Sequence, residues 1–197
     1  MNPRRAFRSD VQHNRKKLLA AATAAFAASG LQTSLDVIAR QAGVGIGTLY
    51  RHFPTREHLI LAAYRHEVEQ LCVAATMLPL SLSPDLALRQ WMQRFIDYMA
   101  AKRGMSEALR SVTLSEDDIS SSSGLKKEIV STLAALLERA VAAGTIRDDM
   151  DAEDVFRAMS GICLVSSEQD WQDRARRLLD LMMDGLRYGA STDSIPR

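Results

Sequence analysis

The sequence has few of the features that mark membrane, secreted or disulfide-rich proteins. No run of 18 apolar residues exists, so a membrane span is not expected. The basic N-terminus lacks the apolar stretch of a secretory signal. Only two cysteines occur, Cys72 and Cys163, with no CxxC pair. They fit a reducing compartment, and we expect them to be small core residues without a redox or metal role.

Catalytic and metal-binding patterns are also missing. The chain shows no Ser/His/Asp arrangement and no phosphate-binding loop. His58 and His66 stand eight residues apart, which does not match the i, i+4 spacing of a helical metal site. We therefore expect no enzymatic activity, no cofactor and no metal, and an all-α enzyme is the least favoured alternative.

What the chain does contain is an uneven distribution of charge. Residues 1–66 hold ten Lys and Arg against three Asp and Glu, a balance of +7, whereas residues 67–197 hold 15 against 21, a balance of −6. The overall charge of +1 therefore conceals a basic head on an acidic body. Such asymmetry indicates that one part meets a polyanion and the other does not.

Helical periodicity dominates the chain, and no long alternating run predicts a strand. We expect an all-α protein of about nine helices. The capping-box pattern at Ser9 predicts the start of the first, Thr33 the start of the second, and Ser83-Pro84 that of a long helix. The serine-rich, acidic stretch 115–124 is expected to be a loop. The other expected helices cover about 46–53, 56–78, 105–114, 125–143, 151–165 and 170–188.

The segment Leu35 to Phe53 is typical of a helix-turn-helix. Gly43 stands where the chain must turn sharply, a position at which a positive φ is favoured. The second helix would turn Leu49 inward and leave Gly47, Thr48 and Arg51 outward, so that it can enter the major groove of DNA. The alternative, two short core helices joined by a Gly-rich turn, is disfavoured because the charge asymmetry marks the same segment.

The stretch GIGTLYRHFPTREHL resembles the recognition-helix signature of the TetR/AcrR family of bacterial transcription regulators. AAFAASG and TSLDVIARQAGV upstream look like the same family, so the resemblance covers about residues 10–65. It implies a DNA-binding domain at 1–54, linked by helix 55–78 to a ligand-binding and dimerisation domain at 79–197. Many members have serine where Gly45 stands, so a capping or phosphate-binding hydroxyl is missing here. The resemblance implies backbone contacts by Thr33 (at a helix N-cap), Thr48, Tyr50, His52 and Arg56, and a groove-facing set of Ile46, Gly47 and Arg51.

The family also implies an effector pocket in the second domain. No Arg or Lys there is clearly committed to a charged ligand, so we expect a mainly apolar, uncharged or aromatic small molecule. Ordinary core packing is the alternative for most of the large, adaptable side chains in this region. The candidate lining residues are Trp91, Phe95, Tyr98, Met99, Met159 and Cys163.

The last two expected helices carry more apolar residues than one helix pair needs for its own packing. Two such pairs from two subunits would form a four-helix interface, although the faces can also pack only internally. The residues concerned are Phe156, Met159, Trp171, Leu178, Leu179, Met182 and Leu186.

These observations together predict a homodimeric, cytoplasmic regulator. We expect a repressor that binds a palindromic operator in double-stranded DNA and leaves it when the effector binds. The arginine-rich arm from Asn2 to Arg8 would either touch DNA or remain a solvated tail. The competing interpretation is a helical ligand-binding or protein-interaction module without sequence-specific DNA recognition.

Overall fold

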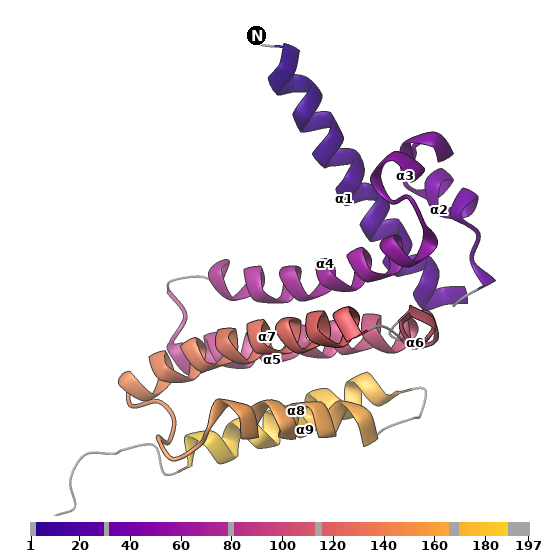
Figure 1. Cartoon of the computed structure of the whole chain (residues 1–197). Coiled ribbons are helices and arrows are strands. Elements are labelled where there is room, and N and C mark those ends of the chain that lie inside the picture. Colours follow the sequence, from indigo (N-terminus) through magenta and orange to yellow (C-terminus); the bar gives the residue numbers. More distant parts are fainter. Residues whose placement is uncertain (1–2, 30–31, 79–80, 113–115, 166–169, 189–197) are drawn as a thin grey trace, which may run out of the picture. The chain divides into compact units, whose positions relative to one another are not determined.

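Helices form all the regular secondary structure in the residues that the computed structural model describes, which are 3–29, 32–78, 81–112, 116–165 and 170–188. The all-α prediction is confirmed. Within these ranges no helix is long and apolar enough to cross a membrane. In chain order the helices are α1 (Pro3–Ser29), α2 (Leu35–Gln41), α3 (Ile46–His52), α4 (Arg56–Thr76), α5 (Pro84–Gly104), α6 (Ser106–Val112), α7 (Glu116–Ala142), α8 (Ala152–Val165) and α9 (Trp171–Arg187) (Figure 1).

Two of these helices begin earlier than the sequence patterns predicted. α1 begins at Pro3 and not after the capping-box pattern at Ser9. α7 begins at Glu116, so residues 116–124 are helical where a loop was expected, while position 115 lies outside the described residues. Acidic residues in a first turn complement the helix dipole, and serine is only mildly unfavourable in a helix, so this composition does not exclude α7.

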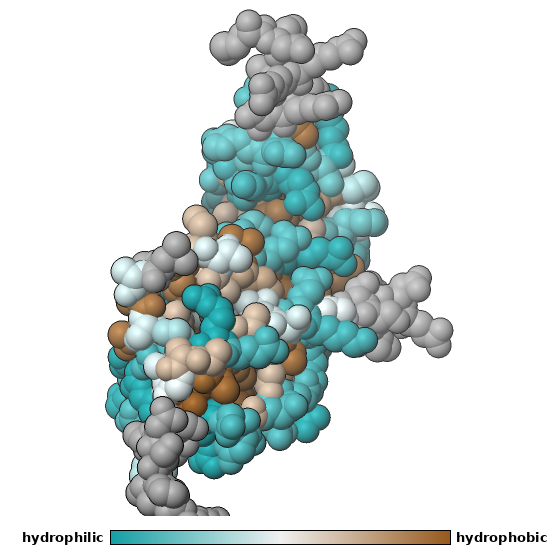
Figure 2. All heavy atoms as spheres, turned by 90° about the vertical axis from the view of Figure 1, so that its left-hand side faces the viewer, coloured by the Kyte–Doolittle hydropathy of each residue, from teal (hydrophilic) through white to brown (hydrophobic). Residues whose placement is uncertain are grey.

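The chain divides into two compact units. Unit 1 comprises Met1–Glu67 and Ala101–Ser121, and unit 2 comprises Val68–Ala100 and Ser122–Arg197. In unit 1, α2 packs on α1 and on α3. The buried core of unit 1 consists of apolar residues at helical spacing, whereas much of the coloured surface in Figure 2 is hydrophilic. Residues i, i+4 and i+8 share one face of a helix, so that whole face can be buried. The fully buried members include Leu18, Ala22 and Phe26 of α1, Ile38 of α2, Leu49 of α3 and Leu59 of α4.

Gly104, the last residue of α5, lies within unit 1 directly against α1. A Cβ atom at this position would come within 2.5 Å of the Cα atom of Ala27. No side chain can be accommodated at that separation without backbone movement, so the glycine permits the close approach of the two helices.

Residues 84–100 of α5 contribute several buried apolar side chains to unit 2. Trp91 is fully buried, and its indole Nε1 donates a hydrogen bond of 2.9 Å to the carbonyl of Leu71 on α4. α8 packs on α9. The C-terminal end of α9 is held to the start of α5 by Arg187, whose Nε and Nη2 lie 2.9 and 2.6 Å from Oδ2 of Asp85. Burial alone would raise the pKa of Asp85, but hydrogen bonds from Ser83 and Arg187 outweigh it and lower the pKa below its ordinary 3.8.

Candidate nucleic-acid interface

The turn between α2 and α3 has the backbone that the sequence predicted. Gly43 has φ of +68°, in the left-handed region where glycine carries no steric cost. The amides of Gly43 and Val44 donate to the carbonyls of Arg40 and Ala39, each at 3.0 Å, and these bonds satisfy the last turn of α2. Ala39 is buried where α2 meets its neighbours. The angle between α2 and α3 is therefore fixed by the backbone as well as by the core.

α3 presents one apolar face to the core and leaves the opposite face to solvent. Leu49 is its only buried residue. Tyr50 is 49% exposed, Gly47 and Arg51 are exposed, and Thr48 is half-buried. The expected DNA-contacting residues Ile46 and His52 are likewise half-buried. A short helix with an outward face of glycine, hydroxyl and guanidinium groups suits the floor of a major groove.

The N-cap position of α3 is a glycine, which has no side chain to cap the helix. Gly45 is the N-cap of α3, with extended backbone and no side-chain cap hydrogen bond. A Cβ atom added at Gly45 or Gly47 would meet nothing within 4 Å. Packing within the chain therefore does not require either glycine to be small. Close approach by another molecule is a sufficient reason for both.

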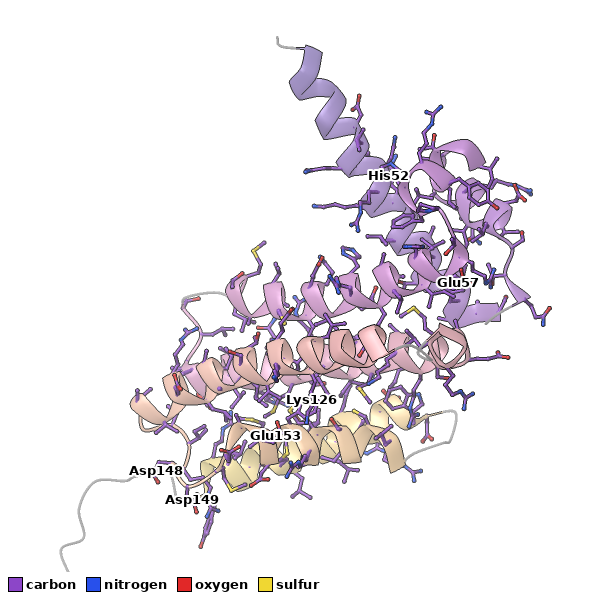
Figure 3. All side chains as sticks on the ribbon, in the orientation of Figure 1. His52, Glu57, Lys126, Asp148, Asp149 and Glu153 are labelled. Atoms are coloured by element: carbon purple, nitrogen blue, oxygen red, sulfur yellow. The ribbon has the colours of Figure 1, made fainter. Side chains whose placement is uncertain are left out.

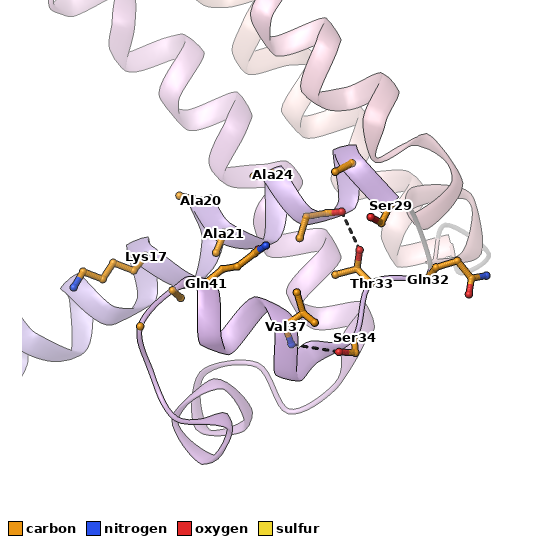
Figure 4. Close-up of a pocket in the computed structure, with 14 residues that line it drawn as sticks. Lys17, Ala20, Ala21, Ala24, Ser29, Gln32, Thr33, Ser34, Val37 and Gln41 are labelled. Atoms are coloured by element: carbon orange, nitrogen blue, oxygen red, sulfur yellow. Dashed lines mark hydrogen bonds between the residues drawn. The ribbon is translucent and has the colours of Figure 1, made fainter.

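Thr33 does not cap α2, contrary to the prediction. The N-cap is Ser34, whose Oγ accepts a hydrogen bond of 3.3 Å from the amide of Val37. Thr33 is only 6% exposed, and its Oγ1 donates 2.9 Å to the carbonyl of Ala25 on α1 (Figure 4). Thr33 and Ser34 are both residue types that favour the N-cap position, and the packing of Thr33 on α1 leaves Ser34 as the cap. The exposed hydroxyl at this end of α2 belongs to Ser34.

Arg56, expected to bind phosphate, is engaged inside unit 1. Its Nη1 lies 2.6 Å from the carbonyl oxygen of Thr33, and its guanidinium stands 5.2 Å from the centre of the Phe26 ring. The first residue of α4 is thereby attached both to the segment before α2 and to α1. These partners are 23 and 30 residues distant in sequence, so no local pattern indicated them. We refer to this arrangement as the Arg56 latch.

The start of α4 is capped as the sequence predicted. Oγ1 of Thr55 accepts a hydrogen bond of 3.3 Å from the amide of His58 and lies 2.9 Å from its Nδ1. A hydrogen bond with Thr55 is the main cause of the lowered pKa of Glu57. Glu57 stands at the beginning of α4 (Figure 3). The first turn of α4 is therefore already supplied with an acceptor and an anion from its own chain.

The predicted effector residues are all buried in unit 2. The Phe95 ring lies 6.3 Å from that of Trp91, 5.6 Å from that of Tyr98 and 5.9 Å from that of Phe156, measured between ring centres. Met99, Met159 and Cys163 are also buried, and none of the six predicted residues is more than 5% exposed. A small molecule could reach this cluster only if some of these side chains moved.

The predicted dimer residues fall into three groups by exposure. Met159, Leu179 and Leu186 are buried in unit 2 of a single chain, whereas Leu178 is 39% exposed. Phe156, Trp171 and Met182 are half-buried. Two leucines that the prediction did not include are more exposed than any of these, namely Leu164 of α8 at 63% and Leu181 of α9 at 67%. Leu178 and Leu181 are three residues apart and therefore lie on the same face of α9. This spacing could have indicated an exposed apolar face from the sequence.

Comparison with known proteins gives one consistent result. Residues 18–63 match the bacterial regulatory proteins of the tetR family, and residues 83–188, more than half of the chain, match the C-terminal domain of SbtR-like transcriptional regulators. A TetR transcriptional regulator from Streptomyces coelicolor is 52% identical, with a TM-score of 0.81, over 88% of this chain and 98% of that one. A TetR transcription regulatory protein from Mycobacterium vanbaalenii is 32% identical, with a TM-score of 0.76, over 92% and 99%.

A more limited similarity involves a named repressor. The HTH-type transcriptional repressor KstR of Mycolicibacterium smegmatis is 37% identical over 65 residues, and the match spans 32% of this chain and 32% of KstR. The helix-turn-helix geometry and both family matches lead to the same assignment: the chain belongs to the TetR family of DNA-binding bacterial transcription regulators.

Proposed function

We propose that this chain is a dimeric repressor that binds a palindromic operator through α3 and leaves it when a small apolar molecule binds unit 2. The observation that carries the proposal is α3 itself. It buries Leu49 alone and turns Gly47, Tyr50 and Arg51 outward on a rigid turn. A regulator acting on DNA in this way needs no catalytic set and works where the DNA is, so we propose a cytoplasmic, non-enzymatic protein.

The side chains of α3 divide between bases and phosphates. Arg51 and Thr48 would hydrogen-bond base edges, arginine to guanine being the commonest such contact, while the small Gly47 and the neighbouring Ile46 let the helix enter the groove. Phosphate contacts would come from Tyr50 and His52 of α3. We add Ser34 in place of Thr33, because Ser34 is the exposed hydroxyl residue at the end of α2.

Selection from randomised duplex DNA tests this assignment. We expect a palindromic consensus, because two recognition helices about 34–36 Å apart read successive major grooves. Arg51→Ala should relax base preference at one position in each half-site, at a cost of about 1–3 kcal/mol. Tyr50→Phe should weaken binding to all sequences alike. A uniform loss with Arg51→Ala, without change in the consensus, would show that this side chain does not read bases.

We propose that α8 and α9 form the dimer seam through their outward leucines. Leu164, Leu178 and Leu181 are 63%, 39% and 67% exposed in the single chain. A second copy would cover them and complete a four-helix interface. The predicted interface residues Met159, Leu179 and Leu186 would then support the seam from inside unit 2, and the half-buried Phe156, Trp171 and Met182 would flank it.

The aromatic and sulfur-containing cluster of unit 2 is the proposed effector site. Trp91, Phe95 and Tyr98 supply flat apolar surfaces, and Met99, Met159 and Cys163 supply side chains that adapt their shape. Because the cluster is buried, binding would select a repacked state, and the effector shifts DNA affinity only by its preference for that state. Titration with apolar, aromatic and highly charged compounds, followed by Trp fluorescence, tests this. Tight binding only to charged metabolites would refute it.

A further inference from the structure

The N-terminal part of α1 extends past the helix-turn-helix (Figure 3). The guanidinium of Arg15 stands 5.5 Å from the centre of the Phe53 ring at the C-terminal end of α3. Twelve residues of α1, 3–14, precede Arg15 in the chain. This part of the helix extends past the position of His52 (Figure 3). We refer to residues 3–17 as the α1 extension. Within it the exposed described side chains are Asp10, Val11, Gln12, His13, Arg15, Lys16 and Lys17, and Asn14 is half-buried.

The α1 extension carries more positive charge than an isolated helix favours. It contains six Lys and Arg and one Asp, a balance of +5. Its first turn has no acidic residue, so nothing there complements the helix dipole. Arg4 and Arg8 stand at i and i+4, where like charges are destabilising. A polyanion would relieve each of these unfavourable terms.

We infer that the α1 extension is a second DNA-binding element, a helix that binds phosphates flanking the operator without reading bases. This rests on the proposed function, because Arg15 places the extension beside α3. An α-helix is too wide for the minor groove, about 6 Å across, so the extension lies along the sugar–phosphate backbone. Twelve residues of helix span about 18 Å. That length corresponds to at most about five base pairs of flanking DNA on each side, at 3.4 Å per base pair.

The test compares duplexes that share the selected palindrome and differ in flank length. For the unaltered chain, affinity should rise as the flanks lengthen and level off at about five base pairs per side. The variant Arg4→Gln/Arg5→Gln/Arg8→Gln should lose this dependence and bind the long duplex roughly tenfold or more weakly at low salt. If six arginines of a dimer each neutralise one phosphate, the slope of log K against log salt becomes shallower by about 5. The selected consensus should not change.

A matched control separates the extension from net charge. Arg94, Lys127 and Arg139 are exposed on unit 2, and Arg94→Gln/Lys127→Gln/Arg139→Gln removes the same charge. This control should keep both the flank dependence and the salt slope. Equal losses in the two triple variants would overturn the inference, as would an unchanged slope in the N-terminal variant or a changed consensus. If the unaltered chain selected no palindrome, the proposed function would fail. The salt slopes of the unaltered chain and the two triple variants, measured on random-sequence DNA, would still decide whether the α1 extension binds phosphate.

Discussion

Replacement of Arg56 distinguishes two physical roles for one side chain. Family resemblance predicts a phosphate contact, whereas the structure engages the guanidinium with the carbonyl of Thr33 at 2.6 Å and with the ring of Phe26 at 5.2 Å. Arg56→Met keeps the aliphatic stem and removes both interactions. We expect the variant to lose stability because the latch joins α4 to α1 and to the segment before α2.

The size of the loss follows from the two contacts. A hydrogen bond from a charged donor contributes about 1.5–3 kcal/mol, and a cation–π contact about 0.5–2 kcal/mol depending on its desolvation. Arg56 is half-buried and the terms are not additive. We therefore expect a loss of about 2–3 kcal/mol, which lowers Tm by about 4–12 °C for a chain of this size. Thermal unfolding followed by circular dichroism measures it.

Two matched variants sharpen the result. Arg51→Met removes an exposed arginine of α3 and should change stability by less than about 0.5 kcal/mol while weakening operator binding. Arg56→Lys keeps the charge but not the planar guanidinium that reaches Thr33 and Phe26 together, so it should lower Tm, but by less than Arg56→Met. The reasoning is refuted if Arg56→Met melts like the unaltered chain and its salt slope is shallower by about 1.8 per dimer, the expected effect of losing one phosphate contact per subunit.

Other positions test the seam, the ion pair and the glycines. Leu181→Glu should yield monomers in sedimentation velocity, whereas Met77→Glu, at a comparably exposed position, should remain dimeric; a dimeric Leu181→Glu would contradict the seam. Asp85→Asn should cost about 1–2 kcal/mol in urea unfolding at pH 7. The pKa of Asp85 in the folded chain lies below 3.8. The stabilisation by the Asp85 carboxylate is therefore present above pH 3.8 and is lost as the pH falls through the folded pKa, where the urea unfolding curves of Asp85→Asn and the unaltered chain should converge. Gly104→Ala should destabilise the chain by about 1–3 kcal/mol through its clash with α1. Gly47→Ala should keep or raise Tm but weaken operator binding in fluorescence anisotropy, and undiminished binding would show that α3 does not approach DNA closely there.

Local patterns determined most of the helices and the turn that positions α3. Apolar residues at i, i+3 and i+4 identify a helix and its buried face without knowledge of what covers that face, as Leu49 illustrates. Gly43 was predictable because its left-handed backbone is a property of a few adjacent residues. The resemblance of the recognition segment to a known family extended these local inferences to function.

Only the tertiary structure decided how individual side chains are used. Thr33 and Ser34 are both residue types that favour an N-cap, and only packing on α1 shows that Thr33 is buried and Ser34 is the cap. In the sequence, Arg56 is a cation whose partners no local pattern indicates. In the structure it contacts Thr33 and Phe26, which are 23 and 30 residues away, and so helps to hold unit 1 together. In α9, periodicity cannot tell whether an apolar side chain faces its own chain or a second copy. The burial of Leu179 and the exposure of Leu181 settle that question for the single chain, because which side of a helix is left open depends on every element packed around it.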